Sequence, residues 1–358
     1  MTALAAILAR RIAAEGPMRL SDYMAECLLH PGHGYYATRD PFGAAGDFTT
    51  APEISQMFGE LLGLCLAQCW LDQGRPAPFA LAEIGPGRGT LMADMLRAIR
   101  AVPGMAEAAR VHLVEASPAL RARQGQVLTA HAPHWHDGVE SLPDLPLFLV
   151  ANEFFDALPI RQFERRGPGW SERMVSLRDG RLAPGLGPVT AYPALAHRLA
   201  DTAEGDVVET CPAVEPAAGE IGRRVAQRGG AALFVDYGGW RSLGDTFQAV
   251  KDHAPADPFA DPGETDLTAH VDFEPIAGAI AAAGAAVTAL TPQGVFLERL
   301  GIAARAAILA RGLSGTALAA HLAAHRRLTH PDEMGQLFKV LAAYPQGKAP
   351  PPGLDPAG

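Results

Sequence analysis

Three glycines spaced two residues apart are the clearest chemical signal in this sequence. Gly85, Gly87 and Gly89 follow an apolar run and precede a helical pattern. Residues without side chains let the backbone approach a ligand closely, and a helix start offers free N–H groups to a carboxylate. The alternative is a tight strand-to-helix turn without a ligand. We favour a ligand-binding loop because two acids, Glu83 and Glu115, accompany the glycines.

The two acids indicate which ligand the loop binds. Glu115 ends the second apolar run, where an acid in open α/β folds accepts hydrogen bonds from two ribose hydroxyls. A dinucleotide site would have Gly-x-Gly-x-x-Gly, but Thr90 occupies the third glycine position counted from Gly85, and Glu83 would repel a pyrophosphate. These features favour an adenosine ligand with a cationic sulfonium and an amino acid tail, S-adenosyl-L-methionine, over NAD.

The elements that must position these residues alternate between strand and helix. Short apolar runs at 79–84, 111–115, 147–151 and 231–236 are separated by helical patterns. Continuous apolar runs are typical of strands buried on both faces, so the sequence predicts a doubly wound, Rossmann-like α/β core with a parallel sheet. An Asp-Gly pair at 179–180 predicts a hairpin.

The division of the chain follows from the same patterns. We expect an N-terminal helical and lid segment at 1–75 and a core at 76–344. The core carries a capping insertion at about 160–230 and a polar loop at 239–270, and the Pro- and Gly-rich tail at 345–358 is expected to be disordered.

Composition excludes several classes of function. A net charge of −9 over 358 residues argues against a nucleic-acid partner, and no segment is apolar enough for membrane insertion. Cys65 and Cys69 share one helix face, which indicates a buried helix rather than a metal site, and we assign no metal. Four cysteines indicate a reducing compartment, so we expect a cytoplasmic protein of bacterial type, with the mitochondrial matrix less favoured. The oligomeric state is not predicted.

Several motifs together resemble one known family. The chain resembles the MidA-type S-adenosyl-L-methionine-dependent methyltransferases over about residues 20–341, in motifs at 34–36, 46–53, 83–90, 152–159, 236–238 and 266–273. That family includes a mitochondrial assembly factor of respiratory complex I. The resemblance implies a class I methyltransferase fold and protein arginine methylation, with a complex I subunit as the substrate of the mitochondrial member.

Two acids after the third predicted strand are candidates for the methyl-transfer chemistry. A guanidinium arrives charged and must lose a proton as it gains a methyl group. Glu153 and Asp156 could bind it through paired hydrogen bonds, and they are our catalytic candidates. The alternatives are that Asp156 caps a helix and that Glu153 is a solvated loop acid.

Further residues are assigned by their place in the motifs. The segment from Gly46 to Glu53 is expected to cover the cofactor as a lid, although it could equally be a structural helix entry. Tyr237, His253 and His270 are candidates for substrate binding, against simple packing or structural hydrogen bonding. The predicted cofactor contacts are Gly46, Asp47, Thr50, Pro52, Glu53, Glu83, Gly85, Pro86, Gly87, Gly89, Thr90, Glu115 and Asn152.

We therefore expect an enzyme that dimethylates an arginine of a complex I subunit during assembly. Two other functions remain open at this point. One is a methyltransferase of another protein or of a small molecule, which the acceptor pocket would reveal. The other is an assembly module that binds the cofactor without turnover.

Overall fold

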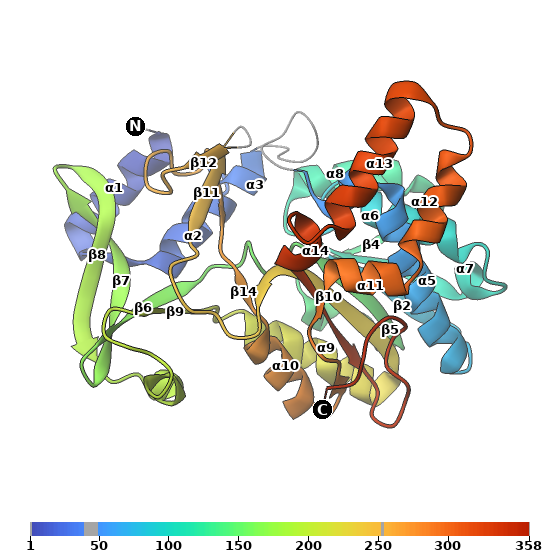
Figure 1. The fold of residues 1–358 in the computed structure, drawn as a ribbon. Coiled ribbons are helices and arrows are strands. Elements are labelled where there is room, and N and C mark those ends of the chain that lie inside the picture. Colours follow the sequence, from blue (N-terminus) through green and yellow to red (C-terminus); the bar gives the residue numbers. More distant parts are fainter. Residues whose placement is uncertain (1, 39–48, 252–253, 358) are drawn as a thin grey trace. The chain divides into compact units, whose positions relative to one another are not determined.

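The chain forms two compact units, each assembled from separate stretches of sequence (Figure 1). The computed structural model describes residues 2–38, 49–251 and 254–357. The core unit comprises Thr49–Phe155, Glu215–Trp240 and Phe273–Gly358. The accessory unit comprises Met1–Phe48, Asp156–Val214 and Arg241–Asp272.

A mostly parallel sheet lies at the centre of the core unit, with the strand order β15-β17-β10-β5-β2-β3-β4. Every residue of β2 and β5 is buried, as expected for strands covered on both faces. The four predicted strands and the doubly wound fold are confirmed. The strands are β2 (Phe79–Ile84), β3 (Ala109–Val114), β4 (His134–His136), β5 (Leu147–Asn152) and β10 (Gly230–Gly239), which pair in parallel, and β15 (Ala286–Val287), β16 (Thr291–Pro292) and β17 (Phe338–Tyr344), which join by antiparallel pairing.

Helices of the core unit pack closely where glycine lets them approach. A Cβ on Gly59 would lie 2.6 Å from Asp94 Cβ of the neighbouring helix, so α5 and α6 are in near-backbone contact. Cys65 and Cys69 are buried in α5, which confirms the buried-helix interpretation of that pair. The helices are α4 (Ala51–Ile54), α5 (Gln56–Asp72), α6 (Thr90–Ile99), α7 (Met105–Ala108), α8 (Pro118–Val127), α9 (Val214–Arg228), α10 (Phe273–Ala282), α11 (Gln293–Arg299), α12 (Ile302–Ala310), α13 (Gly315–Thr329) and α14 (Met334–Leu337).

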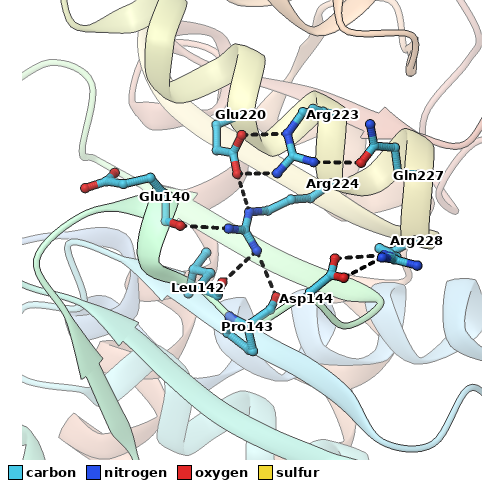
Figure 2. Close-up of polar contacts among 9 residues, drawn as sticks. All are labelled: Glu140, Leu142, Pro143, Asp144, Glu220, Arg223, Arg224, Gln227 and Arg228. Carbon is cyan, nitrogen blue, oxygen red and sulfur yellow. Dashed lines mark hydrogen bonds and ion pairs between the residues drawn. The ribbon is translucent and has the colours of Figure 1, made fainter.

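A buried arginine fastens α9 to the segment that leads into β5 (Figure 2). The Arg224 guanidinium donates to the backbone carbonyls of Glu140, Leu142 and Pro143 at 2.8–2.9 Å, and to the Glu220 carboxylate at 2.7 Å. Backbone carbonyls in an irregular segment have no ladder partners, so a five-donor side chain satisfies several of them at once. This arrangement fixes the entry to β5, whose far end carries site residues.

The accessory unit combines an N-terminal helical part with two small sheets. The predicted Asp179-Gly180 hairpin is confirmed: Arg178 pairs with Arg181, and the two turn residues have φ of +53° and +74°. Its elements are α1 (Ala3–Glu15), α2 (Leu20–Leu29) and α3 (Tyr35–Thr38), a sheet of β1 (Met18–Arg19), β6 (Arg161–Arg166), β7 (Gly169–Arg178), β8 (Arg181–Thr190) and β9 (Val207–Thr210), a sheet of β11 (Gln248–Lys251), β12 (Ala254–Ala256) and β13 (Asp266–Thr268), and β14 (Val271–Asp272).

The structure divides the chain differently from the sequence-based division at residue 75. Helices α1 to α3 share a core with the insertion, whereas α4 and α5 pack within the core unit. The polar loop expected at 239–270 contains strands β11 to β13. Burial of apolar faces between distant segments decides membership in a unit, and sequence order does not reveal it.

The C-terminal tail is ordered, which corrects the expectation of disorder. Leu354 is buried, the Ala289 N–H donates to the Asp355 carbonyl at 2.8 Å, and Arg299 pairs with the Asp355 carboxylate. Prolines lower the entropy that the tail loses on folding, so a few contacts suffice to hold it. Among the described residues, no helix is both long and apolar enough to span a membrane.

Candidate functional site

The glycine loop of the core unit joins β2 to α6. Gly85, Gly87 and Gly89 have φ of +64°, +51° and +85°, values that residues with side chains rarely adopt. A Cβ on Gly85 would also lie 2.9 Å from Phe154 Cδ2. Pro86 accepts a hydrogen bond from the Gly89 N–H through its carbonyl at 2.7 Å, which closes the turn before α6 begins. The loop therefore presents bare backbone beside a helix start.

Glu83, at the end of β2, contributes a buried carboxyl group to the same place. Its exposed fraction is 3%, and among the described residues its Oε2 has no hydrogen-bond partner. Burial raises the pKa of Glu83 to about 8, and the charge of Glu115 adds to the effect. A buried acceptor without a protein donor is typical of a group that meets a ligand.

Glu115, directly after β3, is held by two hydrogen bonds. Its Oε1 accepts from the Ser117 N–H at 2.8 Å and its Oε2 accepts from Gln124 Nε2 at 3.0 Å. Burial raises the pKa of Glu115, while these hydrogen bonds oppose the rise. Each oxygen keeps a lone pair for a further donor.

The expected lid is described from residue 49 onward, and this part forms the short helix α4 at the glycine loop. Thr90 Oγ1 donates to Glu53 Oε1 at 2.6 Å, so Glu53 joins α4 to the first residue of α6. Thr50 and Pro52 are both buried at the start of α4. Gly46 and Asp47 lie outside the described residues.

Asn152 and Glu153 lie at the carboxyl end of β5. Asn152 Nδ2 donates to Glu153 Oε1 at 3.0 Å, and the Ala51 N–H donates to the same oxygen at 2.9 Å. Asn152 Oδ1 is buried and has no partner among the described residues. Glu153 has φ of +50°, and burial raises its pKa to about 7. A non-glycine residue in this strained conformation persists only where its surroundings impose it.

Asp236 imposes that conformation, and sequence reasoning missed it. Its Oδ2 accepts the backbone N–H groups of Phe154 and Phe155 at 3.2 and 3.0 Å. These two donors directly follow Glu153 in the chain. Gln124 was missed as well. Neither residue has a spacing signal, although Asp236 belongs to one of the recognised motifs.

The remaining candidates have other surroundings within their own units. Asp156 belongs to the accessory unit, where it is buried and its carbonyl accepts the Ala269 N–H at 3.0 Å. His270 donates its backbone N–H to Thr246 Oγ1 in the same unit. Tyr237 packs its ring against Phe338 with centroids 5.4 Å apart. His253 lies outside the described residues.

The comparisons with known proteins identify the family. Residues 61–291 match a family model described as S-adenosyl-L-methionine-dependent methyltransferase, and this range contains the glycine loop, Glu115 and Glu153. This chain belongs to that methyltransferase family. As a family member it is an enzyme that uses S-adenosyl-L-methionine, so the expectations of fold, enzyme class and cofactor are confirmed.

Relatives match this methyltransferase over nearly its whole length. The protein arginine methyltransferase NDUFAF7, mitochondrial, of Homo sapiens is 36% identical over 94% of this chain and 82% of its own. The Xenopus tropicalis protein of the same name is 34% identical over 94% of this chain and 85% of its own. A crystal structure of a COG1565 superfamily member from Burkholderia thailandensis bound to S-adenosyl-homocysteine has a TM-score of 0.84, with 33% identity, and covers 98% of this chain and 94% of its own.

The expected cytoplasmic location is wrong by this comparison. The curated relatives are named as mitochondrial proteins, and this finding contradicts the expectation. A reducing environment, inferred from the cysteines, does not distinguish the cytoplasm from the mitochondrial matrix, so composition alone had no means of separating them.

The site suits the cofactor of this family. A Cβ at Gly85 would meet the Phe154 ring, so the loop needs glycine there, and the buried acceptors Glu83 Oε2 and Asn152 Oδ1 need donors that the described protein residues do not supply. The ammonium and hydroxyl groups of S-adenosyl-L-methionine are such donors. Glu83, Glu115 and Glu153 would each be stabilised in the ionised form by a cationic ligand and would be disfavoured beside a pyrophosphate.

Proposed function

We propose that this methyltransferase acts on an arginine of a protein, and that the protein is a subunit of respiratory complex I. The relatives that match nearly the whole chain are named protein arginine methyltransferases, and this observation carries the proposal. The assignment to complex I rests on the MidA-type resemblance, whose mitochondrial member acts in the assembly of that complex.

In this proposal the core unit holds the cofactor through its loop and its buried acceptors. The backbone at Gly85 and Gly87 lies against the ligand, Glu115 accepts the ribose hydroxyls, and Glu83 faces the cationic amino acid part. Asn152 Oδ1 accepts a further donor. The bound cofactor supplies a methyl group activated by its positive sulfonium.

Glu153 is the residue we assign to the acceptor arginine. The hydrogen bonds from the Ala51 N–H and from Asn152 Nδ2 both go to Oε1, so Oε2 remains for a guanidinium N–H. A guanidinium has a pKa near 13.8 and must lose one proton as its nitrogen is methylated. A carboxyl whose pKa is raised to about 7 accepts that proton more readily than an ordinary one. Its strained φ fits a residue retained for function rather than stability.

Asp156 is proposed as a second acid for the positively charged acceptor. It is buried in the accessory unit, where burial raises the pKa of Tyr36 and the charges of Asp266 and Asp156 add to that rise. Tyr36 donates its hydroxyl to Asp266 Oδ1 at 2.9 Å. Buried acids attract a cation, so this group suits recognition of a basic protein segment. Tyr237 and His270 stay predictions as substrate contacts.

The test is methyl transfer to respiratory subunits that lack the modification. Complex I from a deletion strain is incubated with the purified enzyme and isotopically labelled S-adenosyl-L-methionine, and the arginines are mapped by tandem mass spectrometry. We expect one or two labelled methyl groups on an arginine of one subunit. A Gly85→Ala variant, designed to weaken cofactor binding, is the control and should transfer less label at a limiting cofactor concentration.

Three outcomes would change the proposal. Label on an arginine of another protein would remove the complex I assignment alone. Label on a different residue type or on a small molecule would remove arginine as the acceptor. Cofactor binding without transfer to any cell component would support an assembly module instead.

A further inference from the structure

Gln124 is a buried amide that contacts three separate parts of the cofactor region. It lies on α8, a mostly polar helix, yet its exposed fraction is 0%. Its Nε2 donates to the Gly87 carbonyl at 2.8 Å and to Glu115 Oε2 at 3.0 Å. Its Oε1 accepts from Trp135 Nε1 at 2.8 Å. Both amide protons and one oxygen lone pair are therefore used.

The chemistry of these partners leaves the amide only one orientation. An indole N–H can only donate, and a carbonyl and a carboxylate can only accept. The Gln124 oxygen must therefore face Trp135, and its nitrogen must face Gly87 and Glu115. If the amide were turned around, all three hydrogen bonds would be lost in a buried place.

The three partners come from different elements. Gly87 is the middle glycine of the loop, Glu115 follows β3, and Trp135 lies on β4, where it pairs with Leu113 of β3. Gln124 also lies under the loop, because a Cβ on Gly89 would be 3.6 Å from Gln124 Cγ. One side chain thus connects the loop, the acid and the neighbouring strand.

The hydrogen bond from Gln124 helps to fix the orientation of the Glu115 carboxylate. Ser117 holds Oε1 and Gln124 holds Oε2, so both oxygens have one fixed donor each. Two vicinal ribose hydroxyls need two acceptors in a fixed relation, since misdirected hydrogen bonds lose most of their strength. The Gln124 hydrogen bond also opposes the rise in the pKa of Glu115 that burial causes, and so favours the ionised acceptor.

We propose that Gln124 is a positioning residue that holds Glu115 against the glycine loop and thereby sets the selectivity for the cofactor's ribose hydroxyls. This inference rests on the proposed role of Glu115 as the ribose acceptor. A purely structural role would give the same burial but would not link an outer strand to hydroxyl recognition. The positioning role predicts that the surroundings of the Trp135 indole change, through Gln124, when the ribose of the ligand binds.

The experiment compares two ligands on folded protein by calorimetry: S-adenosyl-homocysteine and its 2′-deoxy analogue. In the unaltered enzyme the missing hydroxyl should weaken binding about tenfold or more, the loss of a charge-assisted hydrogen bond. Gln124→Met keeps the side-chain length and removes the three hydrogen bonds, and it should reduce the discrimination to about twofold. Gln126→Met, on the exposed side of the same helix, should keep the full discrimination.

A spectroscopic readout separates positioning from simple destabilisation. The indole N–H resonance of Trp135, assigned with Trp135→Phe, should shift when S-adenosyl-homocysteine binds. In Gln124→Met that resonance should already differ and should no longer respond to the ligand. If Gln124→Met does not fold, Trp135→Phe is the second variant: it removes the donor that orients the amide and should lower the discrimination as well.

The outcomes distinguish the inference from its premise. Wild-type discrimination in Gln124→Met, or in Trp135→Phe where only that variant folds, would overturn the positioning role. Glu115→Gln should also lose the discrimination, and combining it with Gln124→Met should lower it no further. If Glu115→Gln keeps the discrimination, the ribose assignment itself fails and the inference fails with it.

Discussion

The pH dependence of cofactor binding provides a sharp test of the buried acid at the end of β2. Glu83 is enclosed by protein, and one of its oxygens has no partner among the described residues. Burial raises its pKa to about 8, and although the Met92 backbone N–H lowers it, the charge of Glu115 raises it further. Without the cofactor, Glu83 is therefore mostly protonated at neutral pH.

The sign and size of the effect follow from that pKa. If ionised Glu83 pairs with the cationic cofactor, binding releases its proton at any pH below about 8. The apparent affinity should then rise by a factor of about 25 between pH 6.0 and 7.5, or about 1.9 kcal/mol. The same raised pKa lowers the stability of the cofactor-free fold as the pH rises from the ordinary value of 4.5 towards 8.

Calorimetry with S-adenosyl-L-methionine across this pH range measures the effect, and two buffers of different ionisation enthalpy count the released protons. Glu83→Gln keeps the shape of the side chain and cannot titrate, so its affinity should change much less with pH. Glu153, whose pKa is raised to about 7, titrates in both proteins, so its contribution to the pH dependence cancels when the two are compared. Equal pH dependence in both proteins, or none in the unaltered enzyme, would refute the pairing of Glu83 with the cofactor.

Three further predictions concern the loop, the acceptor site and the fold. Gly85→Ala should weaken S-adenosyl-homocysteine binding at least about tenfold, because φ of +64° disfavours alanine and its Cβ would meet Phe154. The control is Gly180→Ala, at a glycine with φ of +74° but open space around it, which should leave that affinity unchanged. Glu153→Gln should slow methyl transfer about tenfold or more at unchanged cofactor affinity, and wild-type turnover would return Glu153 to a structural role. Arg224→Met should lower the free energy of unfolding by about 3 kcal/mol because three backbone carbonyls lose their donor; an unchanged denaturation midpoint would contradict this.

Sequence alone determined the local features of this methyltransferase. The glycine spacing predicted the loop after β2, and the apolar runs predicted the parallel strands, because both signals depend on residues within one short segment. The Asp179-Gly180 turn was predictable for the same reason, since only the two turn residues need φ above zero. Glu83 and Glu115 could be placed because a strand end is a defined position in an open α/β fold.

Tertiary structure decided which distant residues complete the site. Gln124 reaches Gly87 and Glu115 only because the parallel register of β2 and β3 brings the two strand ends together. Asp236 fixes the turn after Glu153 although 81 residues separate it from Phe155, because β10 pairs with β5. Such pairings depend on which strands become neighbours, and that choice is made by burying apolar faces of the whole unit. No local sequence pattern shows which strands become neighbours. For this reason the donors and acceptors that hold the predicted residues in place were not visible in the sequence.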